Sequence, residues 1–315
     1  MMSDPTTTPG ESRTLRLAII GFGLIGASLA ASLKRVGHPV EIVAVVRSEA
    51  DADEALTSGI ADRAVVGAAA GVVGADVVLL AVPMLAMREI LEAIAPALAA
   101  NAIITDAGSV KGRFVEDVRA VFGEAPAEER LPFIVPGHPI AGREKSGMVS
   151  ADAALFAGRR VLLTPLPETD EAAINTVAAL WRATGAMVEC LSPERHDRVL
   201  AATSHLPHVV AFALVDALKA RQGADEIFRY AAGGFRDFTR IASSDPVMWR
   251  DICLTNGAAI VETLDELEAS LSTLREAIRR GDGQTLARSE GLAEPCSPTG
   301  PRASRRSPPR PRRRA

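Results

Sequence analysis

The residue of this sequence best suited to chemistry is a histidine in a short segment rich in glycine and proline. His138 lies within GHPIAG, residues 137–142, and imidazole is the side chain that most readily accepts or donates a proton near neutral pH. The surrounding glycines and proline predict a loop, where catalytic groups often lie. A lone loop histidine more often only bonds backbone groups, so the other motifs of the chain decide between the two interpretations.

Three other polar clusters could supply partners for this histidine. They are DAGSVK at 106–111, SHLPH at 204–208 and GGFRDFTR at 233–240. Ser109 and His138 each follow a predicted strand, and ligands of parallel sheets bind beyond the carboxyl ends of the strands. His205 and His208 flank a proline that would begin or kink a helix. Each cluster also has a structural interpretation, such as a histidine that packs locally at a helix end or a salt-bridged Arg240.

A glycine motif near the start of the chain predicts a dinucleotide site. An apolar run at 15–20 predicts a buried strand, and a helical pattern continues through Lys34. Between them lies GxGxxG, whose residues are Gly21, Phe22, Gly23, Leu24, Ile25 and Gly26. The first glycine allows the tight turn, the second lets the backbone approach a pyrophosphate, and the third lets the helix pack on the strand. Val82 and Pro83, at the end of a later predicted strand, are expected to line the same site.

The end of the second predicted strand, residues 41–46, bears on the choice of cofactor. NAD-selective sites usually place an acidic residue there, which binds the ribose 2′-hydroxyl. This chain has Arg47 and Ser48 instead, with no acid before Glu49. Arg47 either faces the 2′-phosphate of NADP or is a solvated surface residue. The sequence therefore favours NADP, or the use of both NADP and NAD.

The order of apolar patterns predicts two domains. Strands alternate with helices over residues 13–192, which predicts an α/β, Rossmann-type domain with a doubly wound, mostly parallel sheet. Only helical patterns follow over 193–289, and their apolar faces exceed what a small bundle needs. We therefore expect a helical substrate domain that also forms a homodimer. Residues 1–12 and the Pro- and Arg-rich segment 290–315 are expected to be disordered.

Composition argues against several classes of function. Seven arginines lie between Arg302 and Arg314, so the rest of the chain is more acidic than the net charge of −4 indicates and has no evident basic face for nucleic acid. Three widely spaced cysteines form no CxxC pair, so we expect neither a disulfide framework nor a metal site. The polar N-terminus and the lack of a long uncharged apolar run predict a cytoplasmic protein without a signal peptide or a membrane span.

Several motifs taken together resemble those of one family, the prephenate/arogenate (cyclohexadienyl) dehydrogenases of tyrosine biosynthesis. Between Leu15 and Ile278, in the family's order, the chain contains GFGLIGASLA, TDAGSVKG, GHPIAGREKSG, SHLPH and GGFRDFTRIASSDPVMWRDI. The resemblance implies a Rossmann domain followed by a helical dimerisation domain, in agreement with the patterns above. It also implies oxidative decarboxylation of prephenate or arogenate, with hydride transfer to NAD or NADP.

The resemblance implies roles for the polar clusters as well. His138 would be the base that accepts the proton of the C4 hydroxyl, and Ser109 would bind that hydroxyl or the imidazole. Arg240 would bind a substrate carboxylate, a task suited to its planar set of donors. Other positions that match the family's substrate pocket are Ser204, His205, His208 and, near the pocket mouth, Glu144.

Two other functions remain open at this point. A β-hydroxyacid dehydrogenase would use a catalytic lysine in its second domain, but Lys219 is the only lysine after Ser192 and lacks a glycine-rich setting. A regulator that only senses a dinucleotide would need neither the His138–Ser109 pair nor a buried Arg240. The chain departs from the family pattern in the missing acid after the second strand and in its C-terminal segment.

Overall fold

The computed structural model describes residues 14–123, 127–143 and 147–291. Glu144, the N-terminal segment 1–12 and most of the segment 290–315 lie outside the described residues. The chain divides into two compact units, one ending at Thr263 and the other beginning at Leu264. All of the described candidate site residues belong to the first unit.

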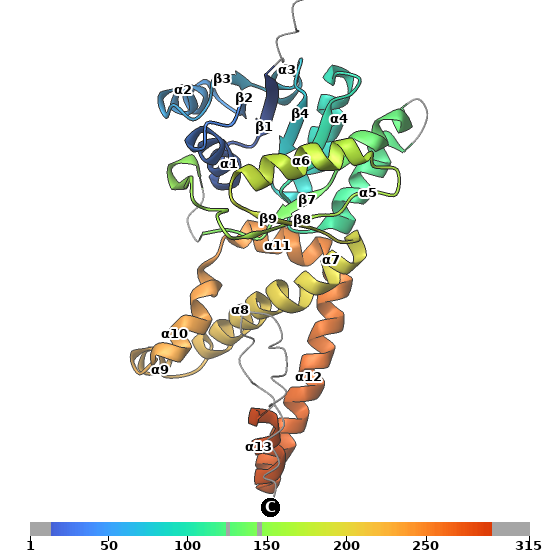
Figure 1. Ribbon diagram of the computed structural model, residues 1–315. Helices are drawn as coiled ribbons and strands as arrows, with labels where there is room; N and C mark the ends of the chain where they lie inside the picture. The colour runs from blue at the N-terminus through green and yellow to red at the C-terminus, as the bar shows by residue number, and fades with distance from the viewer. Residues whose placement is uncertain (1–13, 124–126, 144–146, 292–315) are drawn as a thin grey trace, which may run out of the picture. The chain divides into compact units, whose positions relative to one another are not determined.

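The first unit is built on a six-stranded parallel sheet (Figure 1). Its strands are β1 (Leu15–Ile20), β2 (Val40–Val46), β3 (Arg63–Val66), β4 (Val77–Leu80), β5 (Ile103–Asp106) and β6 (Ile134–Val135). Their spatial order is β3-β2-β1-β4-β5-β6. The order reverses between β1 and β4, which is where doubly wound folds bind their ligands. This arrangement confirms the predicted Rossmann-type architecture.

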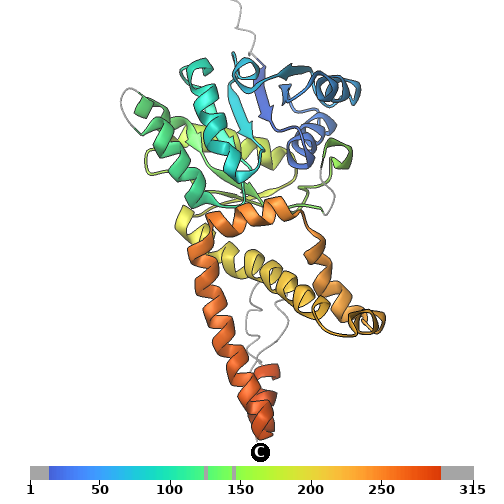
Figure 2. The same ribbon diagram turned by 180° about the vertical axis from the view of Figure 1, so that it is seen from behind.

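Helices cover both faces of this sheet, which explains why its strands are rich in Val, Ile and Leu. One face carries α1 (Leu24–Arg35), α2 (Glu49–Thr57) and α6 (Glu171–Ala183), and the other carries α3 (Ala68–Gly71), α4 (Met87–Ile94) and α5 (Lys111–Phe122). Figure 2 shows the second face, with α4 and α5 in front of the strands. Helix α4 ends at Ile94, and a 3-10 turn containing Pro96 follows, because proline lacks the N–H that would continue the helix.

A second, three-stranded sheet carries His138. It consists of β7 (Gly137–Pro139), β8 (Arg160–Leu163) and β9 (Met187–Cys190), with β7 antiparallel to β8 and β8 parallel to β9. His138 lies opposite Leu162, so the prediction that it is on a loop was wrong. The strand forms despite its glycine and proline because backbone bonds at both of its ends, Thr164 N–H to Pro136 O (2.8 Å) and Ile140 N–H to Arg160 O (2.8 Å), hold it in register.

Among the described residues, every element after position 192 is helical, as predicted. In order these are α7 (Pro193–Leu200), the π turn η5 (Ala201–His205), α8 (Leu206–Lys219), α9 (Ala224–Arg229), α10 (Gly233–Thr239), the 3-10 turn η6 (Arg240–Ser243), α11 (Pro246–Thr255), α12 (Gly257–Arg280) and α13 (Gly283–Gly291). Ser192 caps α7 by accepting the N–H of Arg195 at 3.2 Å. Pro207, the second residue of α8, comes two residues after the π turn ends at His205; its missing N–H fits a turn that is wider than α-helical.

The continuous helical stretch Pro193–Lys219 is long and apolar enough, by length and composition alone, to cross a membrane. Its polar side chains indicate instead that it packs against the rest of the protein. His196 and His205 are buried, and Asp197 is nearly so, and all three are hydrogen-bonded within the protein. This stretch therefore contributes directly to the polar centre of the first unit.

Candidate active site

The glycine motif forms a turn shaped to bring backbone close to a bound group. Gly21 has φ +89°, and a Cβ there would lie 2.4 Å from the carbonyl oxygen of Ala81 and 3.0 Å from Val82. Gly26 approaches the carbonyl of Gly21 equally closely, whereas a Cβ on Gly23 would meet nothing within 4 Å. Gly23 also begins α1 without a side-chain cap, so the first N–H groups of the helix are available. An open glycine at a helix N-terminus suits a pyrophosphate, and the site fits a dinucleotide.

The residues after β2 have a mixed charge. Arg47 is exposed. Ser48 caps α2, since its Oγ accepts the Asp51 N–H at 3.2 Å, and Glu49 and Asp51 occupy the first turn of that helix. The serine hydroxyl is thus committed in part to the helix, and two carboxylates lie close in sequence to the one cation. Both features weaken the argument for a site built around a 2′-phosphate.

A buried ion pair joins the end of β5 to the strand of His138. Lys111 and Asp106 are both fully buried and form an ion pair. The Asp106 carboxylate also accepts the N–H groups of Gly108 (2.8 Å) and Gly137 (3.0 Å), and Lys111 Nζ donates to the Gly137 carbonyl at 2.8 Å. Both polar groups of the Gly137 backbone are therefore held by this pair. His138 follows directly, so the pair fixes where its side chain begins.

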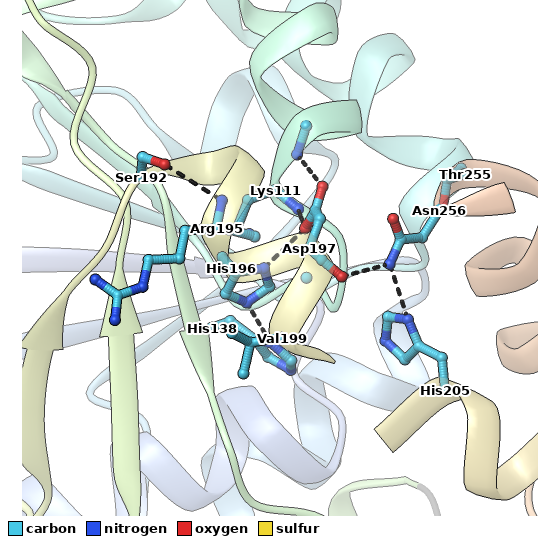
Figure 3. A network of polar contacts seen from close by, with 12 residues as sticks. Lys111, His138, Ser192, Arg195, His196, Asp197, Val199, His205, Thr255 and Asn256 are labelled. Carbon is cyan, nitrogen blue, oxygen red and sulfur yellow. Dashed lines mark hydrogen bonds and ion pairs between the residues drawn. The ribbon is translucent and has the colours of Figure 1, made fainter. Parts of the chain in front are cut away.

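His138 is the first member of a chain of three side chains (Figure 3). Its Nδ1 lies 2.9 Å from Nε2 of His196, and His196 Nδ1 lies 2.7 Å from Oδ1 of Asp197. The Asp197 carboxylate also accepts the N–H groups of Lys111 (2.8 Å) and Gly112 (2.7 Å) at the start of α5. An anion at a helix N-terminus is favourably placed. One carboxylate thus ties α7 to α5 and, through His196, to β7.

Burial is the main influence on the titration of these groups. It holds the pKa of His138 well below its ordinary value of 6.5, and the neighbouring His196 and Lys111 lower it further. Burial also lowers the pKa of His196, against the opposing effect of Asp197. The hydrogen bond from His196 and the two backbone N–H groups lower the pKa of Asp197, although its burial acts the other way. At neutral pH the two histidines are therefore neutral and Asp197 is an anion.

On the helical side, His205 and His208 have different surroundings. His205 is buried, lies 3.0 Å from Nδ2 of Asn256 through its Nδ1, and contacts the edge of Trp249; burial lowers its pKa to about 4. The same Asn256 amide donates to the Asp197 carbonyl at 3.0 Å. His208 is only half-buried and stacks on Trp249, with ring centroids 3.8 Å apart. His205 thus supports the site from behind, and His208 faces the open side.

An open cleft of about 760 Å³ lies beside His208 and contains Arg240. Its other lining residues are Gly142, Arg143, Val149, Ser150, Ala151, Ile241, Ser244, Met248 and Trp249. Arg240 is exposed, so the expectation that it is buried was wrong. It begins the turn η6 directly after α10, a position that projects a long side chain over the cleft instead of into the core. Arg143, which also lines the cleft, is ion-paired with Asp152.

The structure brings together some of the residues singled out in the sequence and leaves others apart. Ser109 lies between Asp106 and Lys111, in the segment that is tied to Gly137, but among the described residues no hydrogen bond links its side chain to His138. Ser204 contributes its carbonyl, which His208 Nδ1 contacts at 2.9 Å. Val82 and Pro83 follow β4, and Val82 packs against the glycine turn.

Sequence reasoning missed residues that join these clusters, namely His196, Asp197, Asn256 and Trp249. Two of these residues contact partners that are distant in sequence. His196 and His138 are 58 residues apart, and Asn256 and His205 are 51 residues apart. The Ser192-Pro193 cap was the only local signal. It predicts the start of a helix and so places His196 and Asp197 in the first turns, but it does not reveal what they face.

Comparisons with known proteins agree along both parts of the chain. The model "Prephenate dehydrogenase, nucleotide-binding domain" matches residues 29–190, and "Prephenate dehydrogenase, dimerization domain" matches residues 192–291. The chain is 40% identical over 274 residues to the cyclohexadienyl dehydrogenase of Zymomonas mobilis, covering 86% of this chain and 90% of that relative. Its structure is similar to the prephenate dehydrogenase from A. aeolicus in complex with hydroxyphenyl propionate and NAD+ (37% identity, TM-score 0.80, covering 90% of this chain and 97% of that one). It is also similar to the Synechocystis arogenate dehydrogenase (26% identity, TM-score 0.75, covering 89% and 97%).

Proposed function

Because the chain belongs to the prephenate dehydrogenase family, an NAD(P)-dependent oxidoreductase family, we propose that it oxidises and decarboxylates prephenate, arogenate or both. Prephenate would give 4-hydroxyphenylpyruvate and arogenate would give tyrosine, in tyrosine biosynthesis. The observation that carries the proposal is the position of His138. It lies beside the carboxyl ends of β5 and β6, at the same edge of the parallel sheet as the turn after β1 that fits a dinucleotide.

The bound nicotinamide supplies the acceptor for the hydride that leaves C4 of the substrate. His138 accepts the proton of the C4 hydroxyl, which a neutral imidazole does without first losing a proton of its own. Ser109 binds that hydroxyl and orients it. Loss of carbon dioxide from C1 then makes the ring aromatic and drives the reaction, so the protein mainly has to align C4 and remove one proton.

Arg240 binds a substrate carboxylate in the open cleft. Its guanidinium presents a planar pair of donors that matches the two oxygens of a carboxylate. His208 completes the polar lining, Ser204 holds the His208 ring through its backbone carbonyl, and Trp249 gives the cleft an apolar wall against which a six-membered ring packs.

Both NAD and NADP are proposed as cofactors. Arg47 is the only cation directly after β2 and favours a 2′-phosphate, while Glu49 and Asp51 oppose it. Comparing kcat/KM for the two cofactors, in the wild type and in Arg47→Ala, tests this. A fall in NADP efficiency with NAD unchanged would support a role for Arg47. A strong preference for NAD that survives the substitution would contradict it.

The protein is also proposed to be a soluble homodimer, divided at Ser192 into a dinucleotide-binding part and a helical part. The match of residues 192–291 to a dimerization-domain model supports this. So does the surface of the helices, since Leu254 is 67% exposed and Val261 55%. Large apolar side chains so exposed on neighbouring helices commonly become buried in an interface. Light scattering of the purified protein measures the oligomeric state.

An absorbance assay at the reduced-nicotinamide band separates the proposal from its alternatives. We expect reduction of NAD or NADP with prephenate or arogenate, and no reaction with small β-hydroxy acids. The β-hydroxyacid alternative is disfavoured because Lys219 is exposed at the end of α8. Binding of dinucleotide without turnover of either cyclohexadienyl substrate would favour the sensing regulator and overturn the proposal.

A further inference from the structure

We propose that His196 and Asp197 are positioning residues that select the tautomer of His138 and leave its Nε2 as the atom that accepts the substrate proton. The inference rests on the proposed function for the identity of that proton. The observations behind it are independent of function. They are the unbroken contacts from Asp197 through His196 to His138 and the complete burial of the His196 ring (Figure 3).

The tautomers of both histidines follow from the charge of Asp197 at one end of this chain of contacts. The Asp197 carboxylate is ionised and only accepts hydrogen bonds, so the His196 nitrogen next to it, Nδ1, carries a proton. A neutral His196 then presents the lone pair of Nε2 to His138. His138 Nδ1 must therefore be the protonated nitrogen of its own ring. The lone pair of His138 is left on Nε2, the ring nitrogen that does not face His196.

The anchoring of Asp197 makes this selection rigid. Its carboxylate is held by the two N–H groups of Lys111 and Gly112, which are backbone groups and cannot reverse their polarity. Its carbonyl accepts from Asn256. Backbone donors of α5 thus occupy one side of the Asp197 carboxylate, and His196 bonds to the other side. A flip of the His196 ring would break a buried hydrogen bond, which is costly.

The charged groups around His138 are consistent with a neutral base that remains in one form. Lys111, His196 and His205 act on His138 itself, and Asp197, Lys111 and Asp106 act on its partner His196. Lys111 and Asp106 offset each other as an ion pair. Once His138 gains the substrate proton, its Nδ1–H still donates to His196, whose own Nδ1–H points to the Asp197 anion. The gained charge is thereby stabilised without any rearrangement.

The decisive experiment is histidine NMR on the wild-type dimer without substrate, using 15N-labelled histidine and single-residue variants for assignment; the chain has five histidines. We expect the Nδ1–H tautomer for both His138 and His196. In His196→Ala, the His138 signals should become an average of the two tautomers. If the wild-type His138 carries its proton on Nε2, the proposal is overturned. This readout needs no turnover, so it stands apart from the test of the proposed function.

Kinetics provide the second readout. His196→Ala should lower kcat by about 10- to 100-fold with KM for prephenate changed by less than about threefold, as expected when a base is held less precisely. His196→Gln should recover part of this loss, because its amide oxygen can still accept from His138 Nδ1. His38→Gln, at a partly exposed histidine on the segment between α1 and β2, is the matched control and should behave as wild type. Normal kcat in a folded His196→Ala enzyme would overturn the proposal, whereas an inactive wild type would refute only the assigned reaction.

Discussion

Replacing Lys111 with methionine is expected to reveal how strongly the buried ion pair holds the site. Methionine has nearly the length of lysine and fills much the same space, so the change removes mainly the charge and its donors. Asp106 would keep the N–H groups of Gly108 and Gly137 but lose its counter-ion. The Gly137 carbonyl would lose the bond from Nζ at 2.8 Å.

The size of the effect can be bounded from both sides. Breaking a buried pair by removing one partner typically costs about 3–5 kcal/mol. The variant can avoid part of that cost by protonating Asp106, which at pH 7 requires about 4 kcal/mol for a carboxyl group of ordinary pKa. We therefore expect the free energy of unfolding to fall by about 3–4 kcal/mol, which corresponds to a decrease in Tm of about 6–16 °C.

The pH dependence gives a sharper test than the magnitude. Burial already raises the pKa of Asp106 while Lys111 opposes the rise, so in the variant the folded-state pKa lies further above the unfolded one. A protonated Asp106 in the folded variant then binds a proton that the unfolded chain releases at neutral pH. Relative to wild type, the variant should become less stable as pH rises from 5 to 7, by up to about 1.4 kcal/mol per pH unit.

Thermal unfolding of Lys111→Met, measured between pH 5 and 8, checks both expectations. Lys34→Met is the matched control, because Lys34 also pairs with an aspartate, Asp62, but at the surface. Surface pairs contribute about 0–1 kcal/mol. If Lys111→Met loses no more stability than Lys34→Met, or if its loss does not vary with pH, the ion pair does not hold the site as argued.

Three further predictions concern activity. His138→Asn should keep cofactor affinity but lower kcat by about 100-fold or more, as loss of a positioned base does; near-normal turnover would remove His138 from the mechanism. Arg240→Gln should raise KM for prephenate by about tenfold or more, since a charged hydrogen bond contributes about 1.5–3 kcal/mol. Arg236, an exposed arginine outside the cleft, is the control, and Arg236→Gln should leave KM unchanged. An equal rise of KM in both variants would place the carboxylate elsewhere. Because burial lowers the pKa of His138 well below 6.5, wild-type kcat/KM should stay level as pH falls from 8 to 6.5 and decline only at lower pH. A decline of kcat/KM whose midpoint lies at or above pH 6.5 would contradict this.

The parts of the fold that depend on local spacing could be predicted from the sequence. A strand, three glycines at fixed offsets and a helix determine the first turn, and all of them lie within one short segment. Gly21 is required there by its φ of +89°, and Gly26 because a Cβ would lie 2.4 Å from the carbonyl oxygen of Gly21. The change to an all-helical chain after Ser192 was predictable for the same reason, from the helical patterns of residues 193–289.

The conformation around His138 could not be predicted in this way. Glycine and proline at 137 and 139 indicate a loop by local preference, yet the segment is a strand because β8 and the Asp106–Lys111 pair bind its backbone. Similarly, a terminal arginine of a helical segment gives no sign of whether it faces the core or solvent, and Arg240 proved to be exposed. In both cases the deciding partners are distant in sequence.

The same distinction explains why the sequence pointed to His138 as a candidate base but not to the residues that support it. A residue that contacts substrate lies on a recognisable motif, because its immediate neighbours must also be shaped for that task. His196 and Asp197 contact other protein groups, and those contacts arise only when α7 docks on α5 and β7. Asp197 then performs two tasks at once: it accepts the first N–H groups of α5, which stabilises the docking, and it fixes His196. A residue that joins folding to chemistry in this way is found from the hydrogen bonds of the structure, because neither task leaves a pattern in the neighbouring sequence.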